Sequence, residues 1–169
     1  MKKKDILISV AIIAAAGLTL WLYLHRTGYV QMDAGGTDAT LELRSSLFGH
    51  TTISSSAGPT HVRAITHRPQ NLKMFIKYGG RDYQFDSYGP WGKLSQIGIE
   101  KGETTVLRLG PPFTVKPSIR RSGQNRVIEF SIVGRAGEKY QYSRNAPAPK
   151  VRIIDEQGNT LASGTFGFG

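Results

Sequence analysis

The sequence predicts a mainly β protein, in which one antiparallel β-sandwich follows a single hydrophobic helix at the N-terminus. Three observations support this prediction. Residues 6–24 form an apolar run without a charge. After residue 39, short runs of alternating polar and apolar residues recur about every ten positions, with glycine, proline and asparagine between them. The chain has 169 residues and no cysteine. It is therefore long enough to form one domain with its own core, without disulfides or a structural metal.

The apolar run has the length and the flanking residues of a transmembrane helix. Its nineteen residues would span roughly 28 Å as an α-helix, close to the thickness of the hydrocarbon core of a bilayer. Trp21 and Tyr23 lie near its end, where aromatic side chains favour the head-group layer. Lys2, Lys3 and Lys4 precede it. By the positive-inside rule, we expect residues 1–5 in the cytoplasm, a membrane span over residues 6–26 and the C-terminal domain in the periplasm or outside the cell.

A cleaved secretory signal peptide is the alternative interpretation of this segment. Ala14, Ala15 and Ala16 are small enough for a cleavage site. Cleavage there would leave Leu18, Trp21 and other large apolar residues at the new N-terminus. We therefore favour an uncleaved signal anchor with a single pass through the membrane.

The segment after the membrane run is predicted to be a tether. Residues 27–38 contain Gly28, Gly35 and Gly36 and few large apolar side chains. We expect the β domain to cover residues 39–169.

Three hairpins are predicted within the domain. Residues 72–78 and 81–88 alternate on either side of Gly79 and Gly80, which suit a two-residue turn. Residues 113–120 pair with 126–133, and residues 150–155 pair with 160–166. In the second hairpin, Ile128, Phe130 and Ile132 share one face and are expected in the core. Pro117 in the same hairpin indicates an edge strand or a bulge, because proline cannot donate to a central ladder.

The third hairpin carries the one family resemblance in the chain. Residues 150–166 read KVRIIDEQGNTLASGTF, with the turn Asp-x-x-Gly between two apolar strands. This hairpin resembles those of immunoglobulin-like β-sandwich domains in membrane-anchored bacterial envelope proteins. The resemblance covers about a tenth of the chain. It implies an immunoglobulin-like or related fold and carries over no functional residue.

The charge of the chain favours anionic neighbours. There are 22 lysines and arginines against 12 acidic residues, a formal net charge of +10. The densest basic group after the N-terminus is Lys116, Arg120, Arg121 and Arg126, a candidate contact for an anionic surface. No recognition helix, aromatic RNA-binding signature or basic arm accompanies it, which argues against nucleic acid.

No pattern in the sequence predicts a catalytic, cofactor or metal site. The four histidines, His25, His50, His61 and His67, lack a neighbouring carboxylate in a ligand pattern. The serines lack the Gly-x-Ser-x-Gly elbow. The paired glycines fall between strands and do not open a helix, as a phosphate-binding loop would. We therefore expect no cofactor and no catalysis.

One aromatic group is the candidate binding surface. Tyr83, Phe85, Tyr88 and Trp91 cluster in sequence, and exposed aromatics could stack on a glycan or anchor a protein. The alternative, which we favour, is that Tyr83 and Phe85 lie in the core and that Trp91 packs from its loop against the sandwich. The sequence as a whole predicts a non-catalytic, membrane-anchored binding module of the cell envelope. The alternatives are a hydrolase of envelope polymers, with carboxylates that converge only in the fold, and a structural subunit of a membrane complex.

The chain ends at Gly167-Phe168-Gly169, directly after a predicted strand. Two explanations remain open at this stage. The last strand could lie at a sheet edge, or the coding sequence could continue past a recoded stop codon.

Overall fold

The computed structural model describes residues 3–45, 49–141 and 147–166. Its helix α1 (Lys3–Leu24) is followed by a β domain that also contains the short 3-10 helix η1 (Gly92–Leu94). The strands are β1 (Thr27–Asp33), β2 (Asp38–Ser45), β3 (Gly49–Ser54), β4 (Thr60–Arg63), β5 (Thr66–Tyr78), β6 (Arg81–Ser87), β7 (Ile97–Gly98), β8 (Thr104–Arg108), β9 (Thr114–Ser122), β10 (Asn125–Val133), β11 (Lys139–Tyr140), β12 (Lys150–Ile154) and β13 (Thr160–Thr165). The protein is mainly β, as predicted.

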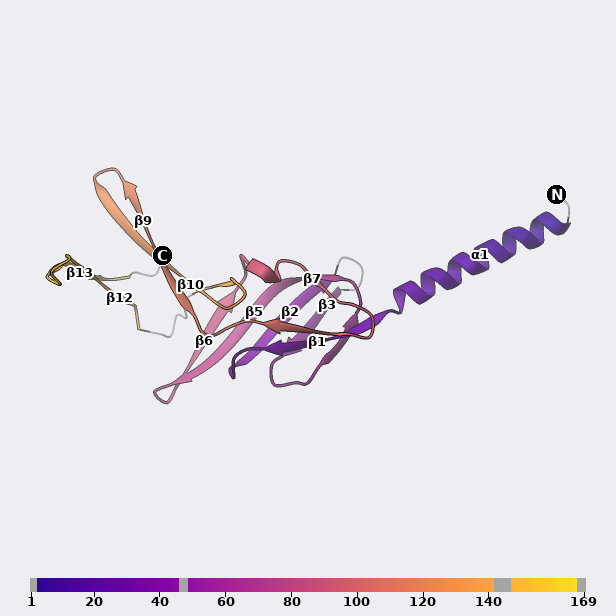
Figure 1. Cartoon of the computed structure of the whole chain (residues 1–169), viewed down its shortest axis with the longest axis horizontal. Helices are drawn as coiled ribbons and strands as arrows, with labels where there is room; N and C mark the ends of the chain where they lie inside the picture. Colours follow the sequence, from indigo (N-terminus) through magenta and orange to yellow (C-terminus); the bar gives the residue numbers. More distant parts are fainter. Residues whose placement is uncertain (1–2, 46–48, 142–146, 167–169) are drawn as a thin grey trace.

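Helix α1 extends away from the β domain and does not lie against it (Figure 1). Its large apolar side chains over residues 12–22 are between 53% and 71% exposed: Ile12, Ile13, Leu18, Leu20, Trp21 and Leu22. Packing within the chain therefore does not explain the apolar character of this helix.

The predicted membrane span is not confirmed. Among the residues that the structure describes, no helix is both long and apolar enough to cross a membrane. The side chains of α1 are described over residues 12–22. At 1.5 Å per residue, this stretch covers roughly 16 Å, about half of a bilayer core.

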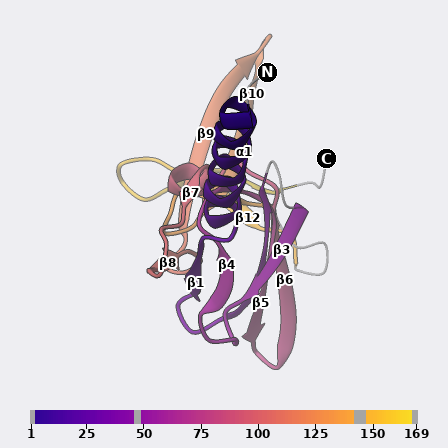
Figure 2. The same cartoon turned by 90° about the vertical axis from the view of Figure 1, so that its right-hand side faces the viewer.

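Two sheets face each other around the main core, an arrangement that fits a β-sandwich (Figure 2). One sheet has the strand order β4-β1-β8, and the other has the order β3-β2-β5-β6 with β7 beside β5. Alternate side chains of each sheet point inward, since the side-chain period of a strand is two. The fully buried ones include Val30 from β1, Leu41 and Leu43 from β2, and Leu72 and Met74 from β5.

The predicted tether is wrong, because residues 27–33 form β1, the middle strand of the smaller sheet. Val30 and Met32 are buried in the core. Gly28, which suggested flexibility, is a packing requirement: a Cβ there would lie 2.2 Å from the carbonyl oxygen of Glu100. The domain thus begins at Thr27, directly after the helix. Strand β1 also pairs with β8 in parallel, so the sheets are not purely antiparallel.

The three predicted hairpins are confirmed, with corrections to their bounds and burial. β5 pairs with β6, β9 with β10, and β12 with β13, all antiparallel. β5 begins at Thr66, six residues before the predicted start. Strand β9 lies at a sheet edge, as Pro117 indicated. Ile128, Phe130 and Ile132 are half-buried and not fully in the core, since the β9–β10 hairpin projects from the domain (Figure 1).

The last hairpin, β12–β13, lies at the end of the domain opposite α1 (Figure 1). Most of its side chains are exposed, including Ile154 at 51% and Leu161 at 67%. The terminal residues 167–169, on which the two explanations of the chain end depended, lie outside the described part.

Candidate functional site

The four predicted aromatic residues do not form one surface. Phe85 packs against the core and stacks on Phe113 with a centroid distance of 5.8 Å. Trp91 also packs against the core, just before η1. Tyr83 is half-buried on β6, whereas Tyr88 is 56% exposed in the loop that follows. Of these four, only Tyr88 presents most of its ring to solvent.

The predicted basic group lies on the β9–β10 hairpin, and the structure divides it between the two hairpin faces. Lys116 and Arg120 are on one face, where Arg120 forms an exposed ion pair with Glu129 at 2.9 Å. Arg121 and Arg126 are on the other face and lie directly opposite each other in the register. Neither of them forms an ion pair within the described part of the chain.

The face with the arginine pair is otherwise apolar. The register places Val115 opposite Ile132, Pro117 opposite Phe130, and Ile119 opposite Ile128. Val115 is 61% exposed and Ile119 is 68% exposed. Contiguous exposed apolar side chains are typical of interaction sites. We call this face the hairpin surface, defined by Val115, Ile119, Arg121, Arg126, Ile128 and Phe130.

The β12–β13 hairpin contacts the hairpin surface at one ring pair. Phe166, directly after β13, makes an edge contact with Phe130 at a centroid distance of 4.6 Å. The backbone amide of Phe166 donates to the carbonyl of Pro149, which closes the base of the β12–β13 hairpin. Val115 and Ile119 keep their exposure beside this contact.

A buried carboxylate fixes the base of the β9–β10 hairpin. Glu138 has no exposed surface. Its Oε1 accepts hydrogen bonds from the backbone amide of Gly110 at 2.7 Å and from the hydroxyl of Tyr140 at 2.9 Å. Its Oε2 accepts from the amide of Ala136 at 2.9 Å. Gly134 leaves room for this carboxylate, since a Cβ there would lie 2.1 Å from Oε1.

The same base is tied to the sandwich by Arg135. Its guanidinium donates to the carbonyl of Leu109 at 2.8 Å and to the carbonyl of Asp33 at 2.6 Å. It also forms an ion pair with the Asp33 carboxylate at 3.0 Å. The loop after β10 is thereby bound to the ends of β1 and β8. The hairpin surface is consequently presented on a fixed base.

The ionisable groups Glu138 and Tyr140 at the base of the β9–β10 hairpin have a structural role. Burial, and then the charge of Glu138, raise the pKa of the Tyr140 phenol far above its ordinary value. Tyr140 therefore stays protonated and keeps donating to Glu138. Both oxygens of Glu138 are occupied and shielded from solvent, so this carboxylate is not placed to act on a bound substrate. No group of three or more histidine or acidic residues that could hold a metal occurs in the described ranges.

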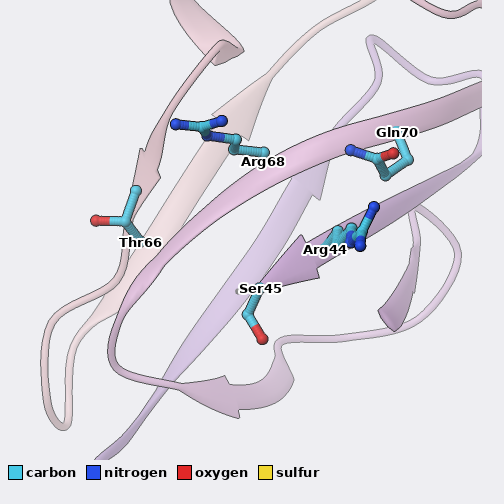
Figure 3. Close-up of a pocket in the computed structure, with 5 residues that line it drawn as sticks. All are labelled: Arg44, Ser45, Thr66, Arg68 and Gln70. Carbon is cyan, nitrogen blue, oxygen red and sulfur yellow. The ribbon is translucent and has the colours of Figure 1, made fainter. Parts of the chain in front are cut away.

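Sequence reasoning missed a second basic pair at the end of the domain next to α1. Arg44 on β2 and Arg68 on β5 lie directly opposite each other and line an open pocket with Ser45, Thr66 and Gln70 (Figure 3). These positions are far apart in the sequence. The strand predicted from the sequence begins only at residue 72. The alternation of exposed Thr66, Arg68 and Gln70 with buried His67 and Pro69 is the signal that could have revealed the strand.

The histidines lie at the same end of the domain. His25, His61 and His67 line one pocket, and His50 forms an ion pair or hydrogen bond with Glu42 at 2.7 Å on the outer sheet face. His61 and His67 belong to separate strands, β4 and β5. His67 is buried, and its Nε2 lies 3.0 Å from the carbonyl of Arg63.

Comparisons with known proteins give no further guide to this site: no family model, curated protein or solved structure matches the chain.

A Glu138 variant tests whether this carboxylate stabilises the base of the β9–β10 hairpin. In Glu138→Gln, one carboxylate oxygen becomes an amide that faces hydrogen-bond donors, so a buried donor loses its partner. We expect a loss of about 2–4 kcal/mol in the free energy of unfolding, measured by urea denaturation. The matched control is Glu129→Gln, which breaks the exposed pair with Arg120 and should cost under about 1 kcal/mol. Equal losses in both variants would contradict the assigned role.

The ion pair of Asp33 predicts a pH effect. Hydrogen bonds from Arg135 and from the Gly35 amide lower the pKa of Asp33 below its ordinary value of 3.8. The stabilisation is therefore present above pH 3.8 and is lost as pH falls through the folded-state pKa. In Arg135→Gln, NMR titration should show the pKa of Asp33 rising towards 3.8. The pKa of Asp155, lowered by Asn159, is the internal reference and should not move. An unchanged Asp33 titration would exclude Arg135 as the main cause.

Proposed function

We propose that this chain is a non-catalytic binding module, anchored in a membrane by α1 with its β domain outside the cytoplasm. We propose further that the hairpin surface docks an acidic segment of a protein partner. The observation that carries this proposal is the exposed apolar pair Val115 and Ile119 beside the opposed Arg121 and Arg126. Sandwich domains of the immunoglobulin-like or related kinds commonly present binding elements at their ends.

The exposure of α1 supports the anchor. Successive helical residues are about 100° apart around the axis. Ile12, Ile13, Leu18, Trp21 and Leu22 therefore point to different sides of the helix, and each is more than half exposed. A helix that packs on one protein surface would have a single apolar stripe, whereas a helix surrounded by lipid is apolar on all sides. The lysines at positions 2–4 favour a cytoplasmic N-terminus.

The composition of the hairpin surface favours a protein over a glycan. Its exposed side chains are aliphatic, flanked by arginine, which is the composition of the core of a protein interface. A sugar-binding platform would instead need flat, exposed aromatic rings, and Tyr88 alone among the predicted aromatics is mostly exposed. An acidic group from the partner between Arg121 and Arg126 would also relieve their repulsion, since like charges opposed across strands are destabilising.

The anchor predicts a definite protease result. A full-length chain with a C-terminal tag should fractionate with membranes at its full mass in spheroplasts. External protease should remove the tag while a cytoplasmic marker stays intact. A shorter soluble product would indicate a cleaved signal peptide. Protection of the tag would overturn the proposed orientation.

Docking at the hairpin surface can be tested by photo-crosslinking in intact host cells. A photoreactive residue in place of Ile119 should give a discrete crosslinked species, because this side chain lies in the middle of the surface. The matched control is the same residue at Tyr78, which is 76% exposed at the turn of another hairpin and should give no such species.

Reversing the charges of Arg121 and Arg126 tests whether the crosslinked partner is acidic. Arg121→Glu with Arg126→Glu should abolish the Ile119 crosslink and leave the melting curve within about 2 °C, since both side chains are exposed. Persistence of the crosslink in this variant would contradict an acidic partner. A crosslink from Tyr78 alone would place the interface elsewhere.

A further inference from the structure

The pocket of Arg44 and Arg68 lies at the end of the domain where the chain leaves α1. Ser45, one of its lining residues, also lines the neighbouring pocket of His25 and Thr27, which follow the helix directly. On the other side, Ala64 donates from its backbone amide to the carbonyl of Arg26 at 3.0 Å, two residues before β5 begins. If α1 is a membrane anchor, as proposed above, this pocket faces the head-group layer.

A β-bulge shapes the pocket. Leu43 pairs with Pro69 and Glu42 pairs with Asn71, so Gln70 is the extra residue on β5. Bulges turn side chains away from the regular ladder. Thr66, Arg68 and Gln70 all lie on the outer side of β5, and Arg44 lies on the outer side of β2. Together with Ser45, they line an open pocket of about 520 Å³, in which the Arg44 side chain lies towards Gln70 and the Arg68 side chain extends towards the Thr66 side (Figure 3).

Among the described residues that line the pocket, most offer hydrogen-bond donors and none is acidic. Neither the Arg44 nor the Arg68 guanidinium forms an ion pair or side-chain hydrogen bond within the described residues. The nearest acid along β2, Glu42, lies 2.7 Å from His50. Arg44 and Arg68 are directly opposed in the register of β2 and β5, and like charges in this arrangement are destabilising. Nothing in the described structure neutralises this pair.

The donor set matches a phosphate group. Each guanidinium presents a fork that binds two oxygens of one anion. The hydroxyl of Thr66 adds a donor that can rotate to a remaining oxygen, and the Gln70 amide, which donates to the carbonyl of Pro69 at 3.2 Å, has a second N–H to offer. We propose that this pocket binds the phosphate of an anionic phospholipid head group, which would orient the domain on the membrane surface.

The experiment uses the full chain in a neutral detergent, so that binding does not depend on α1 crossing a bilayer. The probes are short-chain phosphatidylglycerol, short-chain phosphatidylcholine and inorganic phosphate, with affinity measured by thermal shift. Phosphatidylglycerol should bind saturably and more tightly than the other two probes. Arg44→Gln with Arg68→Gln should weaken this binding at least tenfold. The matched control, Arg120→Gln with Arg121→Gln, should keep it within about twofold, since both pairs remove two exposed arginines.

The possible outcomes test the Arg44 and Arg68 pocket independently of the proposed membrane anchor. Loss of phosphatidylglycerol binding in the Arg44 and Arg68 variant supports the site even if the protease experiment shows that α1 is not an anchor. Unchanged binding in that variant overturns the site. Tighter binding of inorganic phosphate than of phosphatidylglycerol overturns the lipid assignment in favour of free phosphate. The variant should also melt no lower than the unmodified chain, because it removes a repulsive pair, and this checks that the pocket residues are not simply needed for folding.

Discussion

The buried carboxylate of Glu138 is the interaction on which the arrangement of the distal half of the molecule depends. A charged group without solvent contact is stable only when hydrogen bonds replace its hydration. Glu138 meets this condition with donors from three separate positions, Gly110, Ala136 and Tyr140. The loop after β8, the turn after β10 and strand β11 must therefore come together in one geometry. A projecting hairpin attached to this base keeps a defined direction relative to the sandwich.

Local pairing explains which parts of the fold could be predicted. A hairpin requires only alternation and a turn, and both are visible in a short window, so the pairs β5–β6, β9–β10 and β12–β13 were predictable. Strand β1 pairs with β4 and β8, which follow it at a distance in the chain. Its glycine at position 28 indicated a tether, although the cause is the close approach of Glu100. Alternation also divides a hairpin into two faces without showing which face another element covers. This explains the wrong burial expected for Ile128 and Phe130.

The two arginine pairs differ in how far the sequence reveals them. Arg121 and Arg126 flank one turn, so their proximity follows from the hairpin itself. Arg44 and Arg68 meet only through the register of β2 against β5, including the bulge at Gln70. Composition and spacing contain no information about that register. The predicted aromatic group failed as a surface for a related reason: Phe85 and Trp91 contribute to the core, and residue type alone does not separate a ring in the core from one that binds.

The two arginine pairs have in common that like charges lie opposite each other on neighbouring strands. On the outer face of β5 and β6, Lys73 lies opposite Asp86 and Lys77 lies opposite Asp82, so opposite charges face each other in this register. In the registers of the described strands, like charges are directly opposed at Arg44–Arg68 and at Arg121–Arg126. Each opposition is unfavourable for the isolated domain. One pair lies at the end next to α1 and the other near the tip of the far hairpin. The pair on the hairpin lies beside exposed Ile119, whereas the pair next to α1 lies among the polar residues Ser45, Thr66 and Gln70. Each end of the domain therefore carries a directly opposed arginine pair, whereas the sheet between them places lysine opposite aspartate.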